Sequence, residues 1–542
     1  MSDTSPPSTS RETYGPGTVV DHGFQPIPKE CERILRILAS RTPGFTTDEN
    51  LLSNVRFTGQ DLPCIPGPIK SQAVTAVLHA MVGLVGLEIL HLRGVTDSNI
   101  VYVDTDHAGL YPATAALVDI DGITGPLVIK LPTVPQWDKD RASDSPLVYR
   151  ATAIYETADK GVWFQLHGSL DSWKMLAVIG ISKDLDTKIR TNDEAYAVIQ
   201  ERVKTFRSRE LEQIMLEKGL SGSIVHSPQG WQETDMGRSL SRHPLINYKQ
   251  QTQTAPSPFP ELADNRPLAG IKVVELTRII AGAAAGAALA SLGAEVIRVN
   301  SSKLKDYTPA QPSALMAGKT TIDLDLEDPV DYRKLMQLFG EADVILQGYR
   351  LRSFERRGFG LKKALDIANT RGKGIIYVDE NCYGPDGYYA ERPGWQQVAD
   401  AAAGSSYVMG QSFNCPPGQG VLPSLPISDM STGILTALTI MCCIRDRTKF
   451  GGSYHGHASL TAYNMATLDP EVRLYQRDVV QRINDRYQFP SWSSDIHVAP
   501  LYYSILEAWE RESDLIKDEK YYVHFSDSVF GSDLRVLGPV IS

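Results

Sequence analysis

The stretch Ile271-Lys-Val-Val-Glu-Leu-Thr-Arg-Ile-Ile-Ala-Gly282 decides the fold of this 542-residue chain. The apolar run 273–276 predicts a strand, and the alanine-rich residues 284–292 predict a helix that follows it after a glycine-containing corner. The alternation continues with strands expected at 295–299, 343–347 and 375–378 and a helix at 330–339. Strands and helices that alternate with short turns predict an α/β fold: a doubly wound, mostly parallel sheet covered by helices on both faces.

A second segment, Leu425-Pro-Ile-Ser-Asp429-Met-Ser-Thr-Gly433, places one carboxylate between an apolar run and an apolar helix that continues from Ile434. An Asp in this position is most often a helix N-cap. A helix N-terminus also favours the ionised carboxylate, so we expect a lowered pKa for Asp429. An ionised carboxylate beside backbone N–H groups can attack a thioester. The local pattern leaves both roles open.

Composition indicates an ordinary globular protein and excludes several classes of partner. The net charge is −10 and the pI near 5.6, which argues against a nucleic-acid or anionic-membrane surface. The longest apolar run, 73–90, is interrupted by His79 and Glu88 and predicts a buried helix. The six cysteines have no zinc-ligand spacing, so no metal site is expected. We expect a cytoplasmic protein without a nucleic-acid or membrane partner.

The composition changes along the chain and divides it into five parts. Two stretches rich in Ser, Pro, Thr or Gln predict a disordered tail and a linker. The expected parts are a tail at 1–30, a first half at 31–248 that includes a smaller α+β domain, a linker at 249–265, a Rossmann-like domain at 266–470 and a C-terminal extension at 471–542. Within the first half, residues 147–168 alternate apolar and polar side chains as paired strands do.

A weak internal repeat relates the two halves. The segment Pro66-Gly-Pro-Ile-Lys-Ser71-Gln precedes a long apolar helix and a valine-rich strand, as Pro426-Ile-Ser-Asp429 does. In this register Ser71 occupies the place of Asp429. The first half therefore resembles a related unit that lacks the carboxylate, and a single active centre is expected in the second half.

Three further motifs each have two interpretations. The corner Ala281-Gly-Ala-Ala-Ala-Gly286 either packs a helix closely on the sheet or holds phosphates through backbone N–H groups. The arginines between Arg350 and Arg357, and more weakly Lys319, either pair with phosphates or lie on a solvated surface. His455 and His457 alternate on a predicted strand, where a surface position is favoured over a metal pair.

Taken together, these residues resemble the class III CoA-transferases, the formyl-CoA transferase and carnitine-dehydratase-like (CaiB/BaiF) family. The matching segments keep the family's order and spacing over about 180 residues. They are Pro267-Leu-Ala-Gly-Ile-Lys-Val-Val-Glu-Leu-Thr-Arg-Ile-Ile-Ala-Gly, 291–298, 318–326, 342–350, 392–399 and 426–429. The first half looks like the later part of the same fold, with the helix after the nucleophile and then the family's small domain.

The resemblance implies a CoA-transferase that moves coenzyme A from an acyl-CoA donor to a carboxylic acid acceptor. Asp429 would be the nucleophile and would pass through an aspartyl-CoA thioester. CoA is then a substrate, with no permanently bound cofactor and no metal. The positions that match the family's CoA site are Arg278, Ile280, Ala281, Leu324, Tyr349 and Arg356. The family's dimer implies either an interlocked homodimer or a pseudo-dimer within one chain.

Several positions depart from the family pattern and support alternatives. Asn300 and Ser301 replace the usual charged pair, and Gln347-Gly-Tyr349 replaces Glu-Asn-Phe. The racemase branch has a His-Asp pair where this chain has Trp395 and Gln396, which disfavours an acyl-CoA racemase or isomerase. A non-catalytic relative of the transferases is the other alternative, favoured by the lost charges near Asn300 and by the serine at Ser71.

Overall fold

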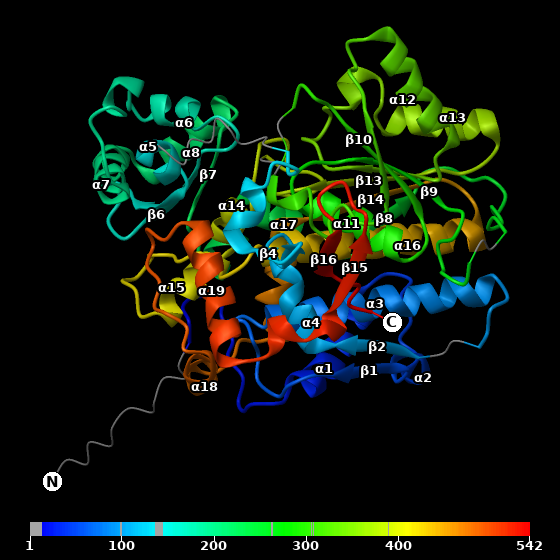
Figure 1. The fold of residues 1–542 in the computed structure, drawn as a ribbon, viewed down its shortest axis with the longest axis horizontal. Helices are drawn as coiled ribbons and strands as arrows, with labels where there is room; N and C mark the ends of the chain where they lie inside the picture. Colours follow the sequence, from blue (N-terminus) through cyan, green and yellow to red (C-terminus); the bar gives the residue numbers. More distant parts are fainter. Residues whose placement is uncertain are drawn as a thin grey trace.

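A seven-stranded sheet forms the centre of the second half in the computed structural model, which describes residues 13–541 except 98–99, 136–144, 262–263, 305, 307 and 389 (Figure 1). Its strand order is β11-β10-β9-β12-β13-β14-β8, and every neighbouring pair is parallel except β14 with β8. The strands are β8 (Asn247–Gln250), β9 (Lys272–Leu276), β10 (Glu295–Asn300), β11 (Lys319–Asp323), β12 (Val344–Gln347), β13 (Ile376–Asn381) and β14 (Tyr454–Ser459). The predicted mostly parallel sheet is confirmed.

Helices cover both faces of this sheet. On one face α12 and α13 share an apolar core with Val274 and Ile345, and on the other α11 and α16 pack against Val273 and Leu346. The helices of this half are α11 (Ala281–Ser291), α12 (Pro329–Glu341), α13 (Leu361–Arg371), α14 (Gln396–Ala403), α15 (Ser405–Ser412), α16 (Ile427–Phe450) and α17 (Leu460–Thr467). Strand order reverses between β9 and β12, and ligands of such sheets bind at the carboxyl ends of strands at this switch point.

The first half begins with a parallel strand–helix–strand unit. Strand β1 (Val55–Thr58) pairs with β2 (Val101–Asp104), and α3 (Ser71–Leu92) connects them. Helix α3 lies against α16, where Thr75 Oγ1 and Ser431 Oγ are 2.7 Å apart. By length and composition both helices could cross a membrane, but 83% and 94% of their most apolar windows are buried in the protein core. The unit also contains α1 (Ile27–Arg41), α2 (Glu49–Leu52) and α4 (Thr105–Leu110).

A smaller α+β domain follows, with its own apolar core. Its antiparallel sheet has the order β5-β6-β7, and the domain lies beside α14 of the second half (Figure 1). Residues 147–150, expected in a strand, are helical because Ser145 caps a turn that begins at Pro146. The elements are β5 (Ala153–Glu156), β6 (Trp163–His167), β7 (Ser221–Ile224), α5 (Pro146–Arg150), α6 (Ser172–Val178), α7 (Asn192–Val203) and α8 (Ser208–Glu217), followed by α9 (Pro228–Gln232) and α10 (Asp235–Leu240).

The C-terminal extension completes a sheet of the first half and forms no small domain of its own. Strand β16 (Asp533–Leu537) pairs with both β15 (Tyr522–Ser526) and β3 (Val118–Ile120), and β4 (Ile123–Thr124) lies at the other edge. The helices before it are α18 (Arg477–Tyr487) and α19 (Val498–Glu512). The extension is therefore interleaved with the first half.

Two segments expected to lack structure are packed. Residues 13–26 belong to the predicted tail, yet Tyr14 is 1% exposed and Val20 forms a bridge with Leu474; residues 1–12 lie outside the described part. Within the predicted linker, Thr252 and Thr254 accept hydrogen bonds from Ser453 and Gly452 beside β14. The side chains of this apparent linker thus pair with backbone N–H groups just before β14.

Candidate functional site

A cavity of about 490 Å³ lies at the switch point of the sheet. Its walls include the segments that follow three neighbouring strands, 278–281 after β9, 348–350 after β12 and 380–382 at the end of β13, together with Asp429 of α16. Four of the predicted CoA-site residues line it: Arg278, Ile280, Ala281 and Tyr349. The structure therefore brings most of the predicted site together at the carboxyl ends of the central strands.

The corner between β9 and α11 is strained and presents unpaired donors. Ile279 has a φ of +70°, a left-handed conformation that is costly for a β-branched residue. Its N–H donates to Asp306 at 3.2 Å, which holds the turn. No side chain caps α11, whose N-cap is Ile280. Arg278 Nη2 is buried without a hydrogen-bond partner among the described residues. Such a guanidinium and a free helix N-terminus together favour an anionic ligand.

Asp429 is the third residue of α16 and is not its N-cap, a position held by Pro426. Its carboxylate forms no hydrogen bond within the described part of the chain. Burial, and next the charge of Asp400, raises the pKa of Asp429 to about 8. The expectation of a lowered pKa is therefore wrong, because desolvation outweighs the helix N-terminus here. Burial also leaves the ionised form poorly solvated, as is suitable for a nucleophile.

A polar network behind the nucleophile holds the start of α16. Asp400 of α14 accepts hydrogen bonds from Ser428 Oγ and Asn464 Nδ2, each at 2.8 Å, and from Gln396 Nε2 at 2.5 Å. Burial raises the pKa of Asp400 to about 6. Gln396, one of the two positions that would carry the racemase pair, thus turns toward this network and supplies no base to the cavity.

A second carboxyl group, Glu380, lines the cavity with Asp429 and was not predicted. Burial, and then the charge of Asp429, raises the pKa of Glu380 to about 8. A Cβ atom at Gly348 would lie 3.0 Å from Glu380 Oε2. The glycine that replaces the family's Asn in this segment therefore makes room for the Glu380 carboxyl. The sequence signal was an acidic residue at the carboxyl end of a buried strand.

The small domain of the first half contributes a further part of the cavity wall, through residues that sequence reasoning did not name. Its contribution includes Ser169, Lys174 and Lys218. Trp395 Nε1 donates to Ser169 Oγ at 3.0 Å, and the Trp395 ring stacks on His167 at 4.9 Å. Both lysine side chains are exposed, and Arg350 reaches the same rim close to Gly219. A cationic rim of this kind suits phosphate groups.

Several predicted residues lie elsewhere. Leu324 is 2% exposed and belongs to the apolar core that Tyr349 also packs against, outside the cavity lining. Arg356 is on the surface in a 3₁₀ turn, and Arg350 occupies the cavity instead. Lys319 is fully buried, where it pairs with Glu275 at 2.8 Å and donates to the Ala283 carbonyl. Burial lowers the pKa of Lys319 to about 8.

The two histidines of β14 occupy an inner strand of the sheet, contrary to the surface position expected. His455 Nε2 lies 2.7 Å from Asp379 Oδ2. His457 is buried, and burial lowers its pKa to about 4. In the described ranges no group of three or more His, Cys, Asp or Glu side chains could hold a metal ion.

Helices α11 and α16 approach closely enough to place Asp429 beside the glycine corner. A Cβ atom at Gly433 would lie 2.5 Å from Ala284 Cβ and 2.7 Å from the Ala281 carbonyl oxygen. Only a glycine fits this crossing. Gly433 is one helical turn after Asp429, so this contact sets how far the carboxylate lies from the start of α11.

Comparison with known proteins gives the same assignment as the site. Residues 268–494 match the family model described as CoA-transferase family III. An acyl-CoA transferase of Gibberella moniliformis is 81% identical over 98% of this chain and 94% of its own length. The acetyl-coenzyme A transferase nodX of Hypoxylon pulicicidum is 31% identical over 76% of this chain and 71% of its own.

A more distant relative, the human succinyl-CoA:glutarate CoA-transferase, is 27% identical over 39% of this chain and 49% of its own length. The relatives from Gibberella moniliformis and Hypoxylon pulicicidum match this chain along most of its length. This chain belongs to CoA-transferase family III and is a CoA-transferase.

Proposed function

We propose that the enzyme moves coenzyme A between an acyl-CoA and a carboxylic acid with Asp429 as the covalent carrier. The observation that carries this proposal is the position of Asp429. It is a carboxylate without a hydrogen-bond partner in the described part of the chain, partly buried at the wall of the cavity that also holds the unpaired Arg278 guanidinium.

The reaction consists of four acyl transfers. The Asp429 carboxylate oxygen attacks the donor thioester carbon, and CoA thiolate leaves, giving a mixed anhydride. The thiolate then attacks the Asp429 carbonyl carbon, which forms the aspartyl-CoA thioester and releases the donor as a carboxylate. The acceptor carboxylate attacks this thioester and expels CoA thiolate, giving a second mixed anhydride. The thiolate then attacks the acceptor's acyl carbon, which releases the new acyl-CoA and restores Asp429.

The other cavity residues bind and orient the substrates. Arg278 and the uncapped start of α11 would hold CoA phosphates or the pantetheine carbonyls, and Lys174, Lys218 and Arg350 would hold phosphates at the rim. Glu380 and Asp429 both have a raised pKa, so the free site carries less than two negative charges at neutral pH. A carboxylic acid acceptor then meets less repulsion than two ionised carboxylates would cause.

Trapping of the intermediate tests the proposal. The enzyme is mixed with acyl-CoA alone, and borohydride is then added to reduce any thioester on the protein. Mass spectrometry should find the reduced side chain at position 429 in the native enzyme and none in Asp429→Asn. Calorimetry with CoA should show that Asp429→Asn still binds. Retained CoA binding without any adduct on the native enzyme would refute the covalent role.

A further inference from the structure

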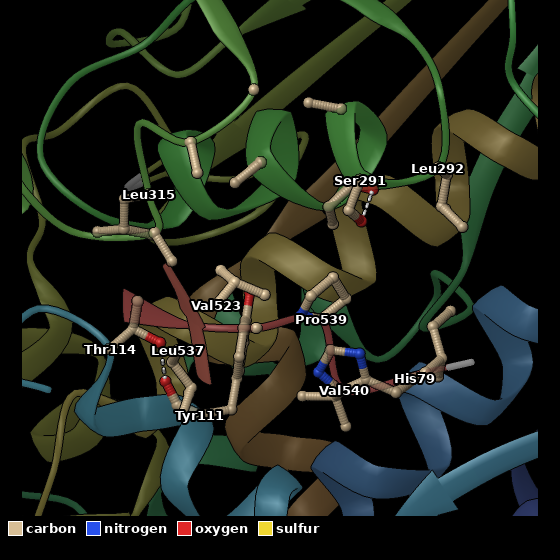
Figure 2. Close-up of a pocket in the computed structure, with 18 of the residues that line it drawn as sticks. His79, Tyr111, Thr114, Ser291, Leu292, Leu315, Val523, Leu537, Pro539 and Val540 are labelled. Carbon is tan, nitrogen blue, oxygen red and sulfur yellow. Dashed lines mark hydrogen bonds between the residues drawn. The ribbon is translucent and has the colours of Figure 1, made fainter. Parts of the chain in front are cut away.

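A second cavity of about 420 Å³ lies near the far end of α11, where this helix meets α3, α16 and the β15–β16 hairpin (Figure 2). Figure 2 shows Tyr111 and His79 on one side and Leu315 and Ser291 on the other, with the C-terminal residues Pro539 and Val540 between them. Residues of the first half, the second half and the C-terminal extension all contribute to its walls.

This cavity is distinct from the CoA cavity, and the two linings share no residue. Helix α11 gives Ala281 to the CoA cavity and Ala287 and Ala288 to the second one. One buried apolar cluster, which includes Met430, contains Ile280 of the first lining and Leu315 of the second. The second cavity is therefore a separate chamber that shares two helices with the catalytic site.

The lining is mainly aliphatic, and the charged groups at it are already paired. Arg266 lies 2.6 Å from Asp264, and the two ring nitrogens of His524 lie 2.9 Å from Asp533 and 3.3 Å from Glu519. Because Arg266 and His524 are already paired with carboxylates, they do not favour an ionic ligand in this cavity. An apolar cavity of several hundred Å³ with a few polar groups is typical of small-molecule sites.

One polar side chain at this cavity is unsatisfied. His79 is 5% exposed, and its Nε2 has no hydrogen-bond partner among the described residues. Its ring meets that of Tyr111 edge to face at 4.8 Å. Burial, and next the charge of His107, lowers the pKa of His79 to about 3, so the imidazole is neutral at physiological pH. A buried nitrogen without a partner is costly unless a bound molecule completes its hydrogen bond.

We propose that this cavity binds an uncharged, mainly apolar small molecule with one hydroxyl or carbonyl oxygen, and that this oxygen pairs with His79 Nε2. The aliphatic walls take the body of the molecule, and the single neutral nitrogen fixes its orientation. Because α11 and α16 also form the CoA cavity, the ligand would bind beside the helix pair that positions Asp429.

The experiment uses the fluorescence of N-phenyl-1-naphthylamine, an uncharged apolar probe, with the full chain. We expect saturable binding at one site that saturating CoA leaves unchanged. Ala288→Leu places a larger side chain in the cavity and should raise the dissociation constant of the probe about tenfold or more. Ala177→Leu, the same change on the exposed surface of α6, should bind as the native enzyme does. Retained transferase activity of each variant confirms that it folds. If Ala288→Leu does not fold, Ser291→Leu, on the same wall of the cavity, replaces it in the experiment.

Competition tests the polar contact. In the native enzyme 1-decanol should displace the probe more effectively than 1-chlorodecane, which has no hydroxyl. His79→Leu should reduce this preference by about fivefold, the effect of one hydrogen bond. Equal probe binding in the native enzyme and Ala288→Leu would overturn the proposal, as would displacement by CoA or an unchanged decanol preference in His79→Leu. A change of oligomeric state in Ala288→Leu would also overturn it, because a second copy would then cover the cavity.

Discussion

Replacement of Asp429 by Asn should make the free enzyme more stable at pH 8, although it removes the proposed nucleophile. The pKa of Asp429 is raised from 3.8 to about 8 by burial and by Asp400. Between these two values the folded protein keeps a proton that the unfolded chain releases. Stability therefore falls as the pH rises from about 4 to about 8. Asn cannot ionise, so the variant escapes this loss.

The size of the effect follows from the shift in pKa. The pKa of Asp429 rises by ~4 on folding, and a pKa change of one corresponds to ~1.4 kcal/mol. The gain in the free energy of unfolding of Asp429→Asn at pH 8 is therefore at most about 6 kcal/mol. The Asp429 side chain reaches the water of the CoA cavity, which solvates part of the charge, so we expect a gain of about 2–4 kcal/mol at pH 8. Loss of the Asp429 charge also lowers the pKa of Glu380 in the variant, so this second carboxyl adds to the gain in the same pH window.

Urea denaturation of the ligand-free proteins between pH 5 and 8 measures this difference. The stability advantage of Asp429→Asn should be small at pH 5 and grow steadily to pH 8. Asp366→Asn, at an exposed position of α13, is the matched control and should show no such trend. Equal stability of the native protein and Asp429→Asn at pH 8 would refute the burial argument. In the native enzyme kcat/KM should correspondingly rise with pH toward about 8, because only the ionised carboxylate attacks.

Three further substitutions test how the site is assembled. Gly433→Ala should lower stability by about 1 kcal/mol and reduce kcat, because overpacking at the α11–α16 crossing exceeds the helix-propensity gain; unchanged thermal unfolding would contradict this. Lys218→Ala should raise KM for acyl-CoA about threefold at low salt and less at high salt, whereas exposed Lys188→Ala should not; identical KM values would exclude a phosphate contact. Trp395→Phe removes the hydrogen bond to Ser169 of the small domain and should lower the free energy of unfolding, measured by urea denaturation, by about 1 kcal/mol. An unchanged urea midpoint would show that this bond does not stabilise the protein.

The parts of the fold that local patterns encode were predictable from the sequence. The apolar runs of β9, β10 and β12 alternate with helices over short distances, and the glycine corner before α11 is contiguous in the chain. Asp429 and Arg278 could be assigned because each follows such an element in the family's order. They lie close together because the carboxyl ends of parallel strands meet on the same side of the sheet.

The remainder depends on long-range contacts that one sequence does not contain. Lys218 is an ordinary exposed lysine at the end of α8 until the small domain is placed over the cavity. The pKa of Asp429 is raised because residues distant in the sequence remove much of the water around it, and no local pattern shows this desolvation. Leu324 and Arg356 follow the family's order but point into the core and to the surface. Motif position therefore did not predict where these two side chains lie.

Isotope transfer to Asp429 tests the covalent mechanism most directly. An acceptor carboxylic acid labelled with ¹⁸O in both carboxyl oxygens is turned over with an acyl-CoA donor, and the peptide that contains Asp429 is then analysed by mass spectrometry. In the proposed sequence the bridging oxygen of the second anhydride leaves with the enzyme, so Asp429 should gain ¹⁸O during turnover. Direct attack of the acceptor on the donor thioester would leave Asp429 unlabelled while acyl-CoA is formed, and that result would contradict the mechanism.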